Sequence, residues 1–401
     1  MTTNPNPNLN VAARPITILG AGHIGFALAL MLRRAGGYSV RVADHDPQRL
    51  QVLHELGFEV CLIQGAADTH VAIAHQYAVL NALPFHKAVS VAQMCVAAGV
   101  HYFDLTEDVR STQAIQALAV DAHSVLMPQC GLAPGFIGVL GHDLAKRFDS
   151  VDSLRLRVGA LPRYPSNRLG YNLTWSTEGL INEYCNPCEA LVDGVPQQVP
   201  ALEGLETFAI DGMAYEAFNT SGGLGTLTHT LQGRARHVDY KSIRYPGHHA
   251  VMKLLLQDLR LAEKRGLLKD ILEGALPGTD QDVVLVFATA TGRREGRWLQ
   301  ESYAVRVLGD MVEGQRLSAI QRTTAAGMCV ALDLVAQGQL PQAGFIGQEQ
   351  IGLGDFLANR FGRTMAGESA LDALYPGIDA PAKGLTQAQV GDLQNTAAVL
   401  R

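Results

Sequence analysis

A glycine-rich turn between a strand and a helix, at residues 16–36, constrains the fold of this chain more than any other feature. Residues 16–19 predict a short, largely apolar strand, and the helix after the turn carries apolar residues every three or four positions. In a dinucleotide-binding turn, Gly20 permits a sharp reversal, Gly22 lets the backbone approach a pyrophosphate, and Gly25 lets the helix pack closely on the strand. The turn therefore predicts a pyrophosphate bound to N–H groups at the helix start.

The residue after the second predicted strand bears on the identity of the dinucleotide. This strand, residues 39–43, ends at Asp44, whose carboxylate can accept hydrogen bonds from the adenosine ribose. A 2′-phosphate adds roughly −1.5 to −2 charges, and like unit charges 4 Å apart repel by about 4 kcal/mol at an effective dielectric near 20. We therefore expect NAD as the cofactor and NADP less, although Arg41 and Arg49 lie close enough in sequence to neutralise a phosphate.

Strands and helices alternate through the first third of the chain, which predicts an α/β fold with a Rossmann-type doubly wound parallel sheet. Further strands are predicted at 58–63, 77–80, 100–105 and 124–128, and helices at 47–56, 69–75 and 86–98. Ligands of such sheets bind beyond the carboxyl ends of the strands, so residues 81–84 and 104–107 should share one edge with the glycine turn. The predicted cofactor-binding residues are Gly20, Gly22, His23, Ile24, Gly25, Asp44, Asn81, Ala82 and Leu83.

The sequence pattern changes to period two from residue 154 onwards. Residues 154–159 alternate apolar and polar side chains, as do parts of 283–291 and 302–308, which predicts antiparallel strands with one solvated face. The prediction is a second α+β domain with a mixed or antiparallel sheet. The predicted division is a disordered tail at 1–13, a Rossmann domain at 14–128 completed by about 322–365, and the second domain at 129–321.

Composition limits the classes of partner. The chain has 401 residues, 47% hydrophobic and 17% charged, and a net charge of −6, which gives no basic surface for nucleic acid or anionic lipid. No signal peptide and no membrane span are recognised, so a cytoplasmic protein is expected. Cys185 and Cys188 have the spacing of a zinc or redox pair, but no second pair follows, and no metal site is predicted.

Five stretches together resemble the saccharopine dehydrogenase family. They are residues 102–106 (YFDLT), 131–135 (GLAPG), 170–179 (GYNLTWSTEG), 220–226 (TSGGLGT) and 239–249 (DYKSIRYPGHH). The last two most resemble its lysine 6-dehydrogenase branch. The resemblance covers nearly the whole chain and implies NAD(P)-dependent oxidation of a carbon–nitrogen bond, in lysine or a lysine-derived secondary amine such as saccharopine, by a homodimer. The domain at 129–321 would then bind the substrate and form the dimer.

This chemistry demands particular groups. Hydride leaves a carbon that bears a neutral nitrogen, whereas the pKa of a free lysine ammonium is about 10.4, so a base or a desolvating pocket is needed. A clamp for the substrate carboxylate is also needed, and Arg244 is the candidate because guanidinium binds carboxylate bidentately. A surface arginine is the alternative. Thr226, in its glycine-rich turn, is a candidate hydrogen-bond donor to the substrate, or simply part of a hairpin.

Two kinds of residue are candidates for the base. Asp104 stands at the carboxyl end of a strand, and His248 or His249 follows Arg244; a helix cap and structural histidines are the alternatives. Tyr171 and Trp175 are candidates for a wall over the substrate methylenes, or for core residues. The resemblance does not fix the base.

The substrate is left open among related amines. Lysine, oxidised to an imine and then a semialdehyde, is favoured because no second basic cluster is evident for the extra carboxylates of saccharopine. A glutamate-forming saccharopine dehydrogenase and an enzyme of carboxyamino-alkyl polyamines are the rival enzymes. A dinucleotide-binding sensor without turnover is the rival from another class.

Overall fold

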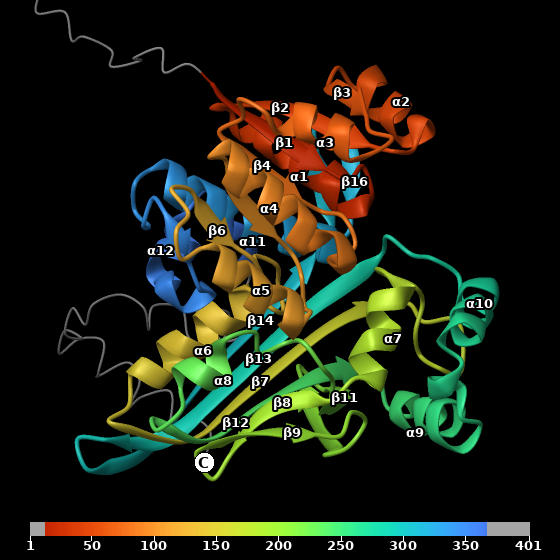
Figure 1. Ribbon diagram of the computed structural model, residues 1–401. Helices are drawn as coiled ribbons and strands as arrows, with labels where there is room; N and C mark the ends of the chain where they lie inside the picture. Colours follow the sequence, from red (N-terminus) through yellow and green to blue (C-terminus); the bar gives the residue numbers. More distant parts are fainter. Residues whose placement is uncertain (1–12, 367–401) are drawn as a thin grey trace, which may run out of the picture.

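Two sheets lie next to each other in the computed structural model, which describes residues 13–366 (Figure 1). The first sheet is built of short strands, most of them from the N-terminal part of the chain. The long strands of the second sheet run below the first sheet in this view. One apolar core extends from β1 and α1 through α11 and α6 into β7 and β13, so the sheets are packed as a single body. All but the last residue of the predicted tail, 1–13, lies outside the described residues.

The first sheet is parallel throughout and has the strand order β3-β2-β1-β4-β5-β6-β17. Strand β1 pairs with β2 on one side and with β4 on the other, so the order reverses at β1 as in a doubly wound sheet. The predicted Rossmann-type sheet is therefore confirmed. Its strands are β1 Arg14–Leu19, β2 Tyr38–Asp44, β3 Glu59–Leu62, β4 Ala78–Asn81, β5 His101–Asp104, β6 Val125–Met127 and β17 Gly344–Phe345.

Helices cover both faces of this sheet. The Asp46 carboxylate caps α2 by accepting from the backbone N–H of Gln48 and Arg49, at 2.9 and 3.4 Å, and Pro47 is the first residue of the helix. Helix α11, from the C-terminal part of the chain, packs against α1. The helices are α1 His23–Ala35, α2 Pro47–Glu55, α3 Ala66–Ile73, η1 Phe85–Lys87, α4 Ala88–Ala98, α5 Val109–Leu118, α11 Ala319–Ala336, η4 Gln348–Gln350, α12 Leu353–Ala358 and η5 Gly362–Met365.

The second sheet is mixed, with the strand order β10-β11-β12-β7-β13-β14 and the β8–β9 hairpin attached to β12. Its β7–β12 pair is parallel and its other pairs are antiparallel. The period-two pattern predicted antiparallel strands, but alternation reports only that one face is wet and carries no information on the direction of the neighbouring strand. The strands are β7 Ser150–Pro162, β8 Cys188–Val192, β9 Val195–Val199, β10 Glu206–Ile210, β11 Met213–Asn219, β12 Ala235–Arg244, β13 Asp282–Arg294 and β14 Arg297–Leu308, and a separate hairpin is formed by β15 Asp310–Val312 and β16 Gln315–Leu317.

The helices of the second domain fall into two groups. Helix α6 lies between the two sheets and contacts β7, β13 and α8, whereas α7, α9 and α10 gather at one end of the second sheet (Figure 1). Their bounds are α6 Phe136–Lys146, α7 Thr177–Cys185, α8 Leu227–Thr230, α9 His248–Lys253, η2 Leu254–Asp258, η3 Leu261–Glu263 and α10 Arg265–Ala275. Among the residues that the structure describes, no helix is both long and apolar enough to cross a bilayer.

Candidate active site

The glycine turn after β1 has room for backbone alone. Gly20 has φ +104°, and a Cβ there would lie 3.0 Å from the carbonyl oxygen of Ala82. A Cβ on Gly25 would lie 1.8 Å from the carbonyl oxygen of Gly20, so α1 and β1 approach each other as only glycine permits. Helix α1 begins with Gly22 as its N-cap and no side chain bonds to its first N–H groups. This arrangement fits the pyrophosphate of a dinucleotide.

Asp44 is buried beside the turn. One of its carboxylate oxygens accepts from the backbone N–H of Ala21 at 2.5 Å, and the other accepts from that of Asp46 at 2.9 Å. The same second oxygen lies 2.9 Å from Nδ1 of the exposed His45. The carboxylate is thereby held at the carboxyl end of β2, where the ribose of a dinucleotide is expected.

The other predicted cofactor residues lie at the same edge. The backbone N–H of Ala82 donates to Leu19 at 2.8 Å, and that of Leu83 donates to the side-chain oxygen of Asn81 at 3.2 Å. His23 and Ile24 are in the first turn of α1. The structure thus brings the predicted cofactor segments together at the carboxyl ends of β1, β2 and β4.

The two arginines near Asp44 differ in their surroundings. Arg41 pairs with Glu59 on the neighbouring strand β3, with 2.6 Å between Nη2 and Oε1. Arg49 pairs with Asp46 at 3.4 Å, and its Nη1 is 3.7 Å from the position that a Cβ on Gly22 would take. Arg49 is therefore the arginine that lies next to the glycine turn.

Asp104 is a buried carboxylate that joins neighbouring loops. It accepts from the hydroxyl of Tyr102 at 2.7 Å and from the backbone N–H groups of Thr106 and Gln129 at 2.9 and 3.1 Å. Burial raises the pKa of Asp104 to about 6, and the three donors oppose this rise. Because Asn81 donates to the same tyrosine hydroxyl at 3.0 Å, Asp104 organises the edge of the sheet from β4 to β6.

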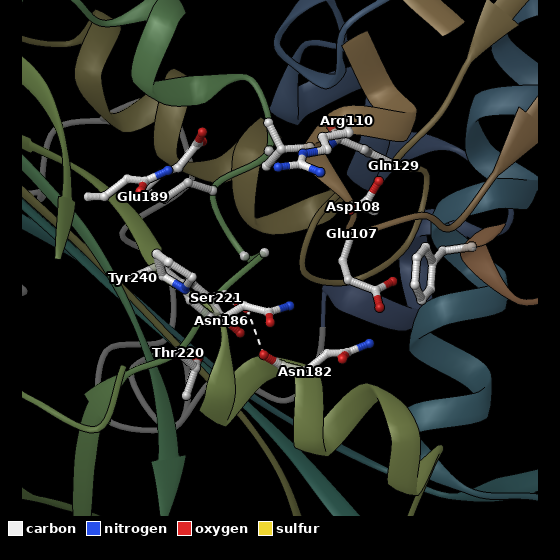
Figure 2. A pocket seen from close by; sticks show the side chains of 18 of the residues that line it. Glu107, Asp108, Arg110, Gln129, Asn182, Asn186, Glu189, Thr220, Ser221 and Tyr240 are labelled. Atoms are coloured by element: carbon white, nitrogen blue, oxygen red, sulfur yellow. Dashed lines mark hydrogen bonds between the residues drawn. The ribbon is translucent and has the colours of Figure 1, made fainter. Parts of the chain in front are cut away.

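A cleft of about 650 Å³ separates this edge from the second domain (Figure 2). One wall comes from the segments after β4, β5 and β6 and from α5, and includes Phe85, Glu107, Asp108, Arg110, Gln113 and Gln129. The opposite wall comes from α7, the β8–β9 hairpin, residues 220–225, β12 and the start of α10, and includes Asn182, Asn186, Glu189, Thr220, Ser221, Tyr240 and Arg265. The cleft is therefore polar and carries charges of both signs.

The TSGGLG segment packs closely across this cleft because its glycines leave space. A Cβ on Gly222 would lie 3.0 Å from Cβ of Glu107, and one on Gly225 would lie 2.9 Å from the side-chain oxygen of Gln129. The Thr226 hydroxyl donates to the carboxylate of Glu349 in η4, whose oxygens lie 2.8 and 2.9 Å away. Thr226 thus fastens the segment to η4, and no substrate contact is needed to explain it.

Arg244 is buried, 2% exposed, and surrounded by other side chains of the second domain. Its Nε donates to the Tyr184 hydroxyl at 2.7 Å, and its Nη2 lies 3.5 Å from Oε2 of Glu183. The guanidinium carbon also lies 5.4 Å from the ring centre of Tyr171 and 5.6 Å from that of Tyr184. The surface-arginine alternative is excluded, and the structure brings Arg244 and Tyr171 together.

His248 belongs to the same cluster, and both of its ring nitrogens are occupied. Nδ1 lies 2.9 Å from the carbonyl oxygen of Leu169 and must donate to it, because a carbonyl only accepts. In the neutral ring Nε2 is then the acceptor, and it accepts from the Tyr184 hydroxyl at 2.9 Å. Burial first, and then the Arg244 charge, lower the pKa of His248 to about 3. The imidazole is therefore neutral and has no free nitrogen for a substrate proton. His249 likewise has Nε2 within 2.7 Å of a carbonyl, that of Leu202.

Trp175 lies against α7, the helix that begins two residues after it. A Cβ on Gly179 of α7 would lie 2.4 Å from the indole ring, so the ring needs glycine at that position. Tyr171 is fully buried and makes an edge-on contact with His248, with 5.5 Å between ring centres. The two aromatics line the inner side of this helical group, and neither belongs to the cleft wall.

Sequence reasoning did not single out two glutamates near the cleft. Glu183 is on α7 beside Arg244, and burial raises its pKa to about 7, an effect that Arg244 opposes and Glu107 strengthens. Burial also raises the pKa of Glu107. Glu107 had a sequence signal, since it ends the 104–107 segment that follows a strand, but Glu183 sits in a helix whose pattern gives no sign of its partner.

Comparisons with known proteins agree with this architecture. Residues 16–126 match the model of the saccharopine dehydrogenase NADP binding domain, and residues 131–363 match that of the saccharopine dehydrogenase C-terminal domain. An apo histidine-tagged saccharopine dehydrogenase (L-Glu forming) from Saccharomyces cerevisiae superposes with a TM-score of 0.69 at 16% identity, over 91% of this chain and 98% of that one. An engineered D-amino acid dehydrogenase bound to NADP+ gives 0.46 at 12% identity, over 88% and 99%.

Proposed function

This chain belongs to the saccharopine dehydrogenase family, whose members are NAD(P)-binding oxidoreductases, and we propose that it oxidises the side-chain carbon–nitrogen bond of lysine with NAD. The product is an imine that water converts to a semialdehyde. The bound nicotinamide supplies the hydride acceptor. The chain supplies the glycine turn and Asp44 for the dinucleotide, and the cleft for the amine.

The charge arrangement around the cleft carries this proposal. Arg244 and Glu183 form an ion pair behind the α7 wall, neither of them among the residues that line the cleft, and their charges are complementary to the α-carboxylate and α-ammonium of an amino acid. Glu107 projects from the opposite wall, where the parallel sheet ends, and suits a second cationic nitrogen (Figure 2). A substrate with an amino-acid head and a side-chain amine has charges that match all three groups, and low solvent exposure would strengthen such contacts.

NAD is proposed over NADP because the buried carboxylate of Asp44 stands where a 2′-phosphate would approach. The name of the matching NADP-binding domain and the position of Arg49 favour NADP instead. Quenching of NADH and NADPH fluorescence measures the preference directly. We expect tighter binding of NADH, and a preference that disappears in Asp44→Ala; an unchanged preference in that variant would remove the argument.

Saccharopine is a second candidate substrate because of the size and charge of the cleft. A volume of about 650 Å³ exceeds what lysine alone fills, and the exposed Arg110 and Arg265 stand on opposite walls. No second basic group is evident in the sequence, since these arginines are 155 positions apart and only folding brings them to one cleft. Extra carboxylates of a secondary amine would find partners there.

The deciding experiment follows NADH absorbance with purified protein, NAD and either L-lysine or saccharopine at mildly alkaline pH. We expect NADH with L-lysine, and a loss of about 100-fold or more in kcat/KM for Arg244→Ala. Arg236→Ala is the matched control, because Arg236 is on the same strand but exposed and paired with Asp193. NADH with saccharopine alone would assign the second candidate, and NADH binding without any oxidation would assign a sensor.

Assembly and compartment are proposed from the family resemblance. We propose a cytoplasmic homodimer formed through the second domain. Light scattering of the purified protein should then give twice the 43.0 kDa of one chain. A mass equal to one chain at micromolar concentration would contradict the dimer and leave the enzymatic proposal unaffected.

A further inference from the structure

Glu107 occupies a fixed position on the cleft wall that the parallel sheet provides. It lies three residues beyond the end of β5, and its side chain extends into the cleft towards α7 (Figure 2). The backbone of Gly222 packs on its inner carbons, since a Cβ there would meet Cβ and Cγ of Glu107 at 3.0 and 3.4 Å. The aliphatic part is therefore held, and the carboxylate is the end that faces the cleft.

The charged neighbours that shift the pKa of this carboxylate are of its own sign. Burial raises the pKa of Glu107, the neighbouring carboxylates raise it further, and its own backbone N–H is the group that lowers it. Within residues 13–366 no Lys, Arg or His side chain forms an ion pair with it, and Arg244, beyond Glu183, is engaged by that residue. The acidic groups that interact with it are Asp104 and Asp108 on its own loop and Glu178 and Glu183 on α7, and Arg110 of α5, Glu189 of β8 and Arg265 of α10 line the same cleft.

The other candidate proton acceptors already have hydrogen-bond or ion-pair partners within the protein. Asp104 accepts three hydrogen bonds from within its own domain. His248 has both ring nitrogens engaged. Glu183 has a cation 3.5 Å away. Among the described residues, three carboxylates line the cleft without an ion pair. Asp108 caps α5 and Glu189 is on β8 near His229, whereas Glu107 lies just beyond β5, at the sheet edge where the dinucleotide is proposed.

We propose that Glu107 is the catalytic base that takes the proton from the substrate ammonium. This role rests on the proposed function. An N–H bond of the ammonium breaks, its electron pair stays on nitrogen, and the proton forms an O–H bond on the Glu107 carboxylate. The neutral nitrogen then shares its pair with the adjacent carbon as that carbon gives its hydride to NAD, which is reduced, leaving an iminium for water to hydrolyse.

The pH dependence of kcat/KM for oxidation of L-lysine, or of saccharopine if that is the amine oxidised, tests this role. A wild-type enzyme with an internal base reaches a plateau above the pKa of Glu107. In Glu107→Gln only the fraction of substrate that is already neutral can react. Its kcat/KM should therefore be about 10²- to 10⁴-fold lower and rise tenfold per pH unit towards the amine pKa of about 10.4. Glu273→Gln, at an exposed position of α10, is the control and should keep the wild-type profile.

NADH binding, followed by fluorescence, and the thermal midpoint show whether Glu107→Gln is folded and binds dinucleotide. A folded variant that keeps the wild-type plateau overturns the role. If Glu107→Gln does not fold or does not bind NADH, Glu107→Asp decides: a plateau supports the role, and a continued rise overturns it. A wild-type protein that binds NADH but oxidises neither amine overturns the proposed function and this role together, whereas wild-type turnover with an unaltered Glu107→Gln profile overturns this role alone.

Discussion

The two walls of the cleft are held by different kinds of interaction. On the parallel-sheet wall, the carboxylates of Asp44 and Asp104 accept from backbone N–H groups of adjacent loops. Behind the opposite wall, side chains hold side chains: Arg244 bonds to Tyr184 across 60 sequence positions, and Tyr184 bonds to His248 across 64. The first wall should therefore be sensitive to added atoms and to pH, and the second to the loss of a single charge.

The largest expected effect on stability is at Arg244. Arg244→Ala leaves Glu183 buried without a cation, which costs about 3–5 kcal/mol of unfolding free energy. The pKa of Glu183 is already raised to about 7 and should rise further in the variant, so the loss should be greater at pH 8 than at pH 5.5. Urea unfolding at both pH values measures this. The control Arg236→Ala should change the unfolding free energy by less than about 0.5 kcal/mol. If Arg244→Ala costs less unfolding free energy than Gly25→Ala, the expected order of the two walls is wrong.

The next effect concerns pH and Asp104. Its pKa is raised from 3.8 to about 6 in the folded protein, so the folded state binds the proton more tightly than the unfolded state. Wild type should therefore lose about 3 kcal/mol from this group as the pH rises from 4 to above 6, and Asp104→Asn should not. Unfolding free energies across this range should favour the variant increasingly with pH. The exposed Asp121→Asn is the control, and parallel curves for wild type and Asp104→Asn would show that Asp104 is not buried as described.

The smallest expected change in stability is at Gly25. A Cβ there meets the Gly20 carbonyl oxygen at 1.8 Å, so Gly25→Ala must displace the turn, at a cost of about 1–3 kcal/mol. Its sharper consequence is for ligand binding, with the Kd for NADH raised about tenfold or more because the turn no longer fits a pyrophosphate. Gly274→Ala, in the interior of α10 with nothing within 4 Å, should leave both quantities nearly unchanged. Normal NADH binding by Gly25→Ala would place the dinucleotide elsewhere.

The family and the features that depend on neighbouring residues are readable from the amino-acid sequence alone. The glycine turn, Asp44 at the end of β2, the Asp46 cap and the alternation of strands and helices are set by backbone geometry within a few positions, and the structure has each of them. The Rossmann-type sheet and the mixed second sheet follow from these local patterns and from the five stretches that resemble the family.

Which polar groups already have hydrogen-bond partners is known only from the folded chain. Asp104 and His248 look in sequence like free acids and bases, but burial and partners from other segments occupy them. Arg244 and Glu183 are 61 positions apart in the sequence, and no period or spacing predicts that they are in contact. Partner choice and burial depend on which segments fold against each other, and the charge that Glu107 carries into the cleft is visible only once both walls are in place.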